Sequence, residues 1–392
     1  MRRNPVRAAP TVLVSAMILL LGGCSEQFTN EEMHLGAATK PRPLAILCEP
    51  PEAAPGQTVN LTLVFHETDA ADTDVAWRVA LDYDPGLYGA DIIERRIVDL
   101  NAAADIPAFA DDGHGFRTQT FAWTVPDSTI LWASSLPSRI DDEAILALAA
   151  VVLPAVPADE ITKEVIDAYL RGLTPADLFA MDLETLAAHQ ALADLFACQI
   201  RLRARLRSDL VVDVTRGLTV RYSSTLGSAN VNTNPEVSGF TVIGIPVDDF
   251  DWSDLDQYHD SAVFYPFTGG GAVLEAHVPR QAGWTYYVFM QTDRQSYTSP
   301  FTPDRLFEEQ ATARWYFFRL DAPAAGQDFF VTDEGESAEM FALDESVRLQ
   351  PPTDGSSPRF RVALCARDQR PEWEMYHGTP GATLVYGDIV FE

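Results

Sequence analysis

Basic residues, and lysine above all, are scarce in this chain. Its 392 residues include 57 Asp and Glu but only 28 Lys and Arg, and the lysines are Lys40 and Lys163 alone. The net charge of −29 repels polyanions, so the composition excludes a protein that binds nucleic acid through its net charge. An acidic surface keeps a protein soluble and can attract divalent cations or basic partners.

Catalytic sequence motifs are missing as well. The chain has no Gly-x-Ser-x-Gly, no His-Glu-x-x-His, no phosphate-binding Gly-rich loop before a helix, and no Cys-x-x-Cys. Its 7 histidines are scattered, and His114 lies in Asp-Asp-Gly-His-Gly, which is typical of a turn. We therefore expect a protein that is not an enzyme.

No apolar run is long enough to cross a membrane as a helix. The longest, Thr11–Leu21, follows Arg2, Arg3 and Arg7 and has the length of the apolar part of a secretion signal. It ends in Leu21-Gly22-Gly23-Cys24. This run resembles the lipobox of bacterial lipoproteins.

The resemblance implies an address and an anchor. Residues 1–23 would be a cleaved signal peptide, and Cys24 would carry a diacylglycerol thioether and an acylated amine, which together hold a protein stably on a membrane. An ordinary cleaved signal with a chance cysteine is the alternative. Ser25 after the cysteine implies the outer rather than the inner membrane of the cell envelope. Residues 24–42 form a tether with a reach of roughly 25 Å.

Strand patterns begin near Leu44. In Thr58–His66 and again in Val75–Tyr83, apolar side chains occupy alternate positions. Between the first strands lies Pro50-Pro51-Glu52-Ala53-Ala54-Pro55-Gly56. This arrangement resembles the start of immunoglobulin-like domains in bacterial surface lipoproteins, which implies that Trp77 is the core tryptophan of a β-sandwich. Further strands are predicted at Phe116–Val125 and Thr129–Ser134.

The pattern changes at about residues 141–195, which are rich in Ala, Leu, Asp and Glu. Asp142 can cap one helix, and Thr174-Pro175-Ala176-Asp177 is a strong helix start. Strands return with Cys198–Arg207, in which apolar residues alternate with arginines. Two further strands, with a turn at Arg216-Gly217, complete a predicted domain over residues 43–228 with a helical insertion.

The remainder, residues 229–392, predicts a second domain of short strands separated by turns. The fold class is therefore mainly β, with two immunoglobulin-like β-sandwich domains. Predicted strands are Val237–Val247, Ala262–Tyr265, Ala272–Val278, Trp284–Gln291, Ala313–Leu320, Asp328–Thr332, Ser346–Leu349, Phe360–Ala366 and Thr383–Phe391. The aromatic residues of this half favour core packing over a sugar-stacking surface; they include Trp284, Tyr286, Tyr287, Trp315, Tyr316 and Trp373.

Three cysteines remain once Cys24 carries lipid. Cys48 shares a strand face with Leu44 and Ile46, and Cys198 shares one with Ile200, so both point toward the core of the same domain. Cys365 alternates with the apolar residues of its strand. We expect a Cys48–Cys198 disulfide, with buried free thiols as the alternative.

An acidic cluster follows the strand at Val237–Val247. Asp249, Asp251, Ser253 and Asp260 occupy positions 1, 3, 5 and 12 of a partial EF-hand-like calcium loop. The required glycine is replaced by Asp254, and no helices flank the loop. A solvated acidic loop is therefore favoured, and calcium binding is the alternative; no other cofactor is expected.

Function is the least determined property. We expect a membrane-anchored lipoprotein that acts as a non-catalytic binding or structural module of the cell envelope, with an envelope protein or polysaccharide as partner. The alternative is an enzyme or solute-binding component with a site between the domains.

Overall fold

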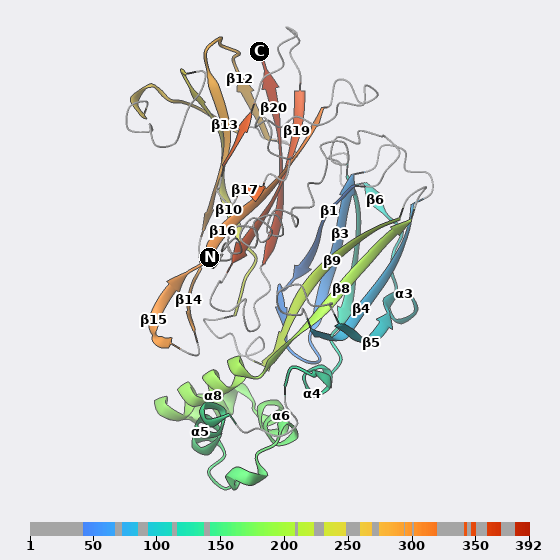
Figure 1. The fold of residues 1–392 in the computed structure, drawn as a ribbon, viewed down its shortest axis with the longest axis vertical. Coiled ribbons are helices and arrows are strands. Elements are labelled where there is room, and N and C mark those ends of the chain that lie inside the picture. Colours follow the sequence, from blue (N-terminus) through green and yellow to red (C-terminus); the bar gives the residue numbers. More distant parts are fainter. Residues whose placement is uncertain are drawn as a thin grey trace, which may run out of the picture.

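The chain is mainly β (Figure 1). The structure is a computed structural model. It describes residues 42–66, 73–84, 93–111, 116–136, 142–207, 211–222, 231–247, 259–268, 274–293, 295–299, 302–319, 341–342, 346–349, 359–369 and 381–392. Within these residues, no helix is long and apolar enough to cross a membrane.

Two sheets, here called the first sheet pair, enclose one hydrophobic core. The first sheet has the order β1-β3-β7-β6, with β1 at Arg42–Glu49, β3 at Thr58–His66, β7 at Arg117–Thr124 and β6 at Ala110–Asp111. The second has the order β2-β9-β8-β4-β5, with β2 at Glu52–Ala53, β9 at Val211–Arg221, β8 at Ala197–Arg207, β4 at Asp74–Asp84 and β5 at Ile93–Asp99.

The alternation in the sequence places the core residues correctly in β3, β4 and β8. Val59, Leu61, Leu63 and Phe65 are all fully buried in the first core. Trp77 is 0% exposed, and its indole nitrogen donates to Gln119 Oε1 at 2.7 Å. That bond satisfies the one polar atom of the ring, which burial would otherwise leave without water.

Three local predictions were wrong. β1 begins at Arg42 and has an irregularity between Pro43 and Ala45, so Leu44 lies in a different cluster from Ile46 and Cys48. Residues Thr129–Trp132 form helix α4 instead of a strand, because Pro126 O accepts from both Thr129 N and Thr129 Oγ1 and starts a helical turn. β9 has no turn, since Gly217 pairs with Arg201 in an unbroken ladder.

Residues 142–196, here called the helical segment, lie between β7 and β8 at one end of the first sheet pair (Figure 1). The helical segment contains α5 at Glu143–Val152, α6 at Lys163–Gly172, α7 at Pro175–Ala180 and α8 at Leu183–Leu195, with a short 3-10 turn at Ala158–Glu160. The helix starts predicted at Asp142 and Thr174 are confirmed. Thr174 and Asp177 form the reciprocal capping box of α7. A single-turn helix, α3 at Leu100–Ala103, follows β5.

The rest of the chain forms the second sheet pair, which has its own core. One sheet has the order β11-β10-β13-β18, with β11 at Val263–Pro266, β10 at Glu236–Ile245, β13 at Thr285–Asp293 and β18 at Ser346–Leu349. The other has the order β12-β20-β19-β16-β17, with β12 at Leu274–Val278, β20 at Ala382–Phe391, β19 at Arg359–Gln369, β16 at Gln310–Arg319 and β17 at Phe341–Ala342. The sequence did not predict the hairpin of β14 (Ser296–Ser299) and β15 (Thr302–Glu308).

The two sheet pairs pack against each other through β1, β19 and β20. The ring of Phe116 stacks on Tyr386 with centroids 4.9 Å apart, and Tyr316 OH donates to Leu44 O at 3.0 Å. Cys365 lies in the same interface with Ala45. The sequence was therefore right that Cys365 points away from the second core, but that face of β19 is covered by β1 and not by solvent.

Candidate functional site

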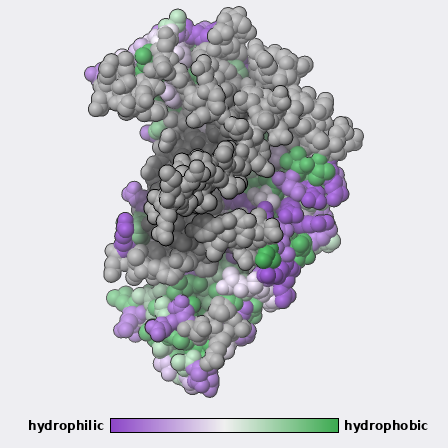
Figure 2. Space-filling model, in the orientation of Figure 1, coloured by the Kyte–Doolittle hydropathy of each residue, from purple (hydrophilic) through white to green (hydrophobic). Residues whose placement is uncertain are grey.

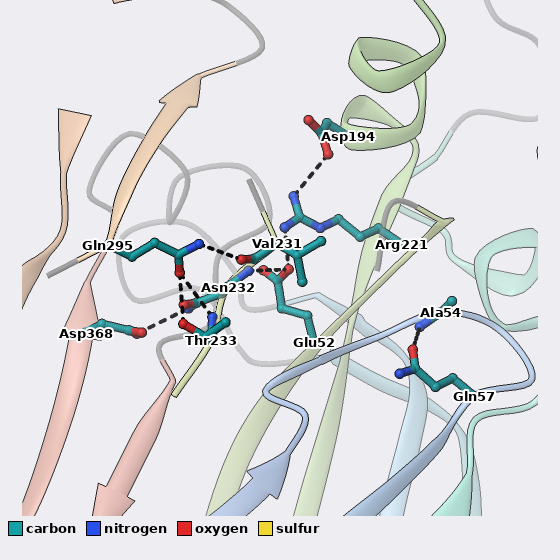
Figure 3. Close-up of polar contacts among 10 residues, drawn as sticks. All are labelled: Glu52, Ala54, Gln57, Asp194, Arg221, Val231, Asn232, Thr233, Gln295 and Asp368. Carbon is teal, nitrogen blue, oxygen red and sulfur yellow. Dashed lines mark hydrogen bonds and ion pairs between the residues drawn. The ribbon is translucent and has the colours of Figure 1, made fainter. Parts of the chain in front are cut away.

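A set of buried charges lies where three parts of the chain meet (Figure 3). β2 and β9 come from the first sheet pair, α8 comes from the helical segment, and residues 231–234 and β19 belong to the second half of the chain. We call this set the polar junction; its charged members are Glu52, Asp194, Arg221 and Asp368.

Arg221 is the centre of the polar junction. It is the last residue of β9 and is 0% exposed. One end of its guanidinium contacts Glu52 of β2, and its Nη1 donates to Asp194 Oδ1 of α8 at 3.3 Å. A buried guanidinium is tolerated only when carboxylates compensate its charge and accept its hydrogen bonds. Two carboxylates from different elements do so here.

The contacts continue into the second sheet pair. Glu52 Oε2 also accepts from the backbone N–H of Asn232 at 3.0 Å, and Asn232 Nδ2 donates to Asp368 Oδ1 at 3.2 Å. Asp368 of β19 also accepts from the backbone N–H of Gly381. An uninterrupted series of polar contacts therefore runs from α8 through β9 and β2 to β19.

A second set of bonds fixes the connecting residues 231–234. Gln295 bridges them, because its Nε2 donates to Val231 O at 2.9 Å and its Oε1 accepts from Thr233 N at 3.2 Å. Asn234 Nδ2 donates to Cys48 O at 3.0 Å, and Asn234 Oδ1 accepts from Ala382 N at 2.9 Å. Asn234 thus joins β1 to β20 with one side chain.

The helical segment is attached to the first sheet pair by further buried charges. Tyr222 OH donates to Asp167 of α6, and Arg171 Nε donates to the same carboxylate at 3.0 Å. Burial, and then the hydrogen bond to Asp167, raise the pKa of Tyr222. Lys163 is also buried, and its Nζ donates to Ala133 O at 3.2 Å. Because its pKa is raised, the Tyr222 phenol keeps its proton and acts as the hydrogen-bond donor to Asp167.

One buried histidine of the helical segment lacks this kind of support. His189 of α8 is 0% exposed, and neither ring nitrogen has a hydrogen-bond partner among the described residues. Its ring meets Tyr169 of α6 edge to face, with centroids 5.8 Å apart, and the Tyr169 hydroxyl is likewise buried without a partner. Burial lowers the pKa of His189, while the nearby Asp194 carboxylate acts in the opposite direction. His189 is therefore held in its neutral form.

The polar junction suits a structural role better than a catalytic one. Each charged group of the polar junction faces an opposite charge or a backbone N–H, as expected for groups that join elements. Among the residues that the structure describes, no group of three or more His, Cys, Asp or Glu side chains could hold a metal ion. Arg221 was not predicted from the sequence; the available signal was a charge placed between the core residues Val220 and Tyr222.

Several predicted residues fall on parts of the chain outside the described ranges. These are Cys24 with the whole tether up to residue 41, His114, Asp249, Asp251 and Ser253, the strand at Asp328–Thr332, and Trp373. Asp260 is described, and it is exposed in a 3-10 turn, His259–Ser261. The calcium loop therefore stays a prediction, since three of its four residues lie outside the described ranges.

The described cysteines are Cys48, Cys198 and Cys365, and all three are buried free thiols. Cys48 and Cys198 do share the first core, but they have different neighbours. Arg216 is the charged group nearest Cys48, whereas Asp82 and Lys163 are those near Cys198. The disulfide that the sequence predicts is therefore absent, and the free-thiol alternative holds, because facing one core does not bring two Cβ atoms to the distance of about 4 Å that a disulfide requires.

The aromatic residues of the second half mostly serve its core. Tyr286 and Trp315 are buried in the second core, and Trp284 packs at its edge. Tyr316 lies between the sheet pairs.

No family model and no curated protein matches this sequence.

Proposed function

We propose that this chain is an exported lipoprotein, anchored through lipid on Cys24, that acts as a non-catalytic binding or structural module of the cell envelope. The observation that carries the proposal is the run Leu21-Gly22-Gly23-Cys24 behind a basic and then an apolar segment. Ser25 favours the outer membrane.

The fold is consistent with two immunoglobulin-like β-sandwich domains, the first with the helical segment inserted. In support, each sheet pair encloses its own core, and most neighbouring strands are antiparallel. Trp77 lies in the first core, opposite Phe121 with ring centroids 5.1 Å apart. Such scaffolds carry many functions, so the fold alone selects none.

The polar junction favours a module over an enzyme. A catalytic or solute-binding site between the domains needs a cavity lined by polar groups that are free to meet a substrate. At the polar junction, Glu52, Asp194 and Asp368 are each 2% exposed and already accept donors from the chain itself. The polar groups of the polar junction thereby stabilise the fold instead of facing a ligand. We therefore expect partners to bind the outer surfaces.

Membrane attachment can be tested directly. Cells producing the wild type or Cys24→Ala are grown with an alkyne fatty acid, and labelling and membrane fractionation are compared. We expect the wild type to be labelled and to sediment with membranes, whereas Cys24→Ala takes up no label and is lost from the membrane fraction after a carbonate wash.

Cys365→Ala is the matched control, because it removes a buried thiol and should leave both labelling and fractionation unchanged. An unlabelled wild type, or a Cys24→Ala protein that keeps the label, would overturn the anchor.

A further inference from the structure

The outer face of the second sheet of the first sheet pair carries a cluster of arginines in a chain that is otherwise acidic. Arg201, Arg203, Arg205 and Arg207 occupy alternate positions of β8, opposite to the core side chains. Arg78 of β4 lies directly beside Arg203 in the register. We call these five residues the arginine face; Figure 2 shows hydrophilic side chains on this side of the molecule with a few hydrophobic ones among them.

The arginine face keeps a small excess of positive charge after its carboxylates are counted. Glu94 pairs with Arg201 at 3.2 Å and with Arg203 at 2.8 Å, and Asp213 holds Arg205 through two bonds of 2.7 Å. Arg78 and Arg207 form no ion pair with any described residue. Asp99 of β5 and Asp74 of β4 lie beside Arg78 and Arg207 in the register without forming ion pairs with them. Four described carboxylates thus lie among the five guanidiniums, which leaves the arginine face with one positive charge in excess. Each guanidinium has five N–H donors.

Exposed apolar side chains border the arginine face. Val211 is 61% exposed and pairs across the strands with Arg207. Ile97 is 53% exposed and pairs with Ala80 of β4. A partner for this surface should therefore combine negative charge with apolar side chains.

The end of the helical segment has the opposite character. Phe179 of α7 is 91% exposed and Leu183 of α8 is 86% exposed. Both helices have capped starts, since Asp177 is bonded to Thr174 at the start of α7 and Asp182 Oδ1 accepts from Thr185 N at 2.8 Å at the start of α8. The turn between them has a backbone bond from Met181 N to Leu178 O at 3.2 Å. Two large apolar side chains thus point outward from hydrogen-bonded elements, and such anchors lose less entropy on association than anchors on unstructured chain.

The exposed surface of the whole helical segment is acidic. Its exposed carboxylates are Asp142, Glu143, Asp159, Glu160, Glu164, Asp177, Asp182 and Glu184. Of the two cations of the helical segment, Lys163 is buried and Arg171 is paired with Asp167. An acidic surface without free cations is repelled by anionic lipid, so the anchors do not suit a membrane. We call Phe179, Leu183, Asp177, Asp182 and Glu184 the helical tip.

We propose that the helical tip of one copy of this chain binds the arginine face of a second copy. Acidic and apolar groups on one surface meet basic and apolar groups on the other, so charge and hydrophobicity match together. Because the two surfaces differ, the two end copies of any assembly each keep one unused surface. Further copies can therefore add at either end. Two apolar anchors alone give a weak contact. Confinement of the copies on one membrane, which rests on the proposed lipid anchor, raises their effective concentration and so strengthens the association.

Crosslinking in intact producing cells tests the contact. Ala180→Cys places a thiol beside Phe179, and Thr215→Cys places one in the centre of the arginine face; both positions are exposed. With a short bismaleimide, the double variant should give dimers, trimers and larger products, while each single variant should stay monomeric. Cys48, Cys198 and Cys365 are buried and should not react, and Cys24 has no free thiol when it carries lipid, as proposed above.

Charge reversal then tests the chemistry of the contact. Adding Asp182→Lys and Glu184→Lys to the double variant should reduce the crosslinked products at least tenfold, and further adding Arg78→Glu and Arg207→Glu should restore them. The matched control is Glu236→Lys with Asp293→Lys, a cross-strand pair of exposed acids in the second sheet pair, which should leave the products unchanged.

Three results would overturn the proposal. A double variant that stays monomeric would show that the copies do not meet in this way. Dimers from Ala180→Cys alone would show a contact between two helical tips. A product that contains a different envelope protein in place of a second copy would assign the helical tip to that partner.

Discussion

A single buried guanidinium, that of Arg221, joins the first sheet pair to the helical segment, and its removal should be costly. In Arg221→Met, the carboxylates of Glu52 and Asp194 stay buried but lose their counter-charge. Breaking a buried pair in this way costs about 3–5 kcal/mol. We expect a loss of that size in the free energy of unfolding, measured by urea denaturation.

Arg205→Met is the matched control for Arg221→Met. Arg205 makes a good bidentate pair with Asp213, but the two side chains are 35% and 36% exposed. Pairs in such settings contribute about 0–1 kcal/mol because water screens them. Equal losses in the two variants would contradict the view that burial makes Arg221 important.

A second prediction at the residue scale concerns His189 and pH. Burial lowers the pKa of His189 in the folded chain, so the unfolded chain binds the proton more readily. The stabilising contribution of the neutral ring is therefore complete well above the ordinary histidine pKa of about 6.5, and it is lost as the pH falls below that value.

The variant His189→Phe has no titrating ring and can keep the edge-to-face contact with Tyr169. We expect its melting temperature to fall less than that of the wild type between pH 7.5 and about 5, where histidine titrates. If the melting temperatures of the two proteins fall by the same amount over this pH range, His189 has no part in the acid sensitivity.

At the scale of elements, two glycines give a matched pair of predictions. Gly56, in the turn before β3, has φ +80°, and a Cβ there would lie 2.7 Å from Asp127 Oδ1. Gly56→Ala should therefore destabilise the protein by about 1–3 kcal/mol. Gly172 ends α6, and a Cβ there would meet nothing within 4 Å, so Gly172→Ala should stabilise it by about 0.4–1 kcal/mol. Thermal melts compare the two; equal shifts would contradict the backbone argument.

Most elements could be predicted from the sequence where one pattern was unambiguous. β8 has strict alternation over Cys198–Arg207, and α7 has a complete capping box, so both were located correctly. Thr129–Trp132 is a short apolar run that suits a strand or a helix equally, and the turn at Pro126 decided between them. The turn at Arg216-Gly217 was wrong because a buried arginine in a core strand resembles a polar loop residue.

At the scale of the whole molecule, the sequence carried little information. The polar junction joins residues 27–180 positions apart along the chain, and no local pattern reports such contacts. For the same reason, the alternation in β19 correctly placed Cys365 outside the second core but could not show that β1 covers it.

Thiol labelling of Cys365 therefore measures opening of the contact between the sheet pairs. Labelling of Cys198 measures opening of the first core, where burial raises the pKa of this thiol to about 12. Phe116→Ala removes the ring that stacks on Tyr386 across the interface. Because 1.4 kcal/mol corresponds to a tenfold change in an equilibrium, loss of this contact should raise the rate of thiol labelling at Cys365 about tenfold or more. Cys198 should stay protected if the sheet pairs separate without unfolding. Equal acceleration at both cysteines, followed by mass spectrometry, would instead mean that the two sheet pairs open only when the first core unfolds.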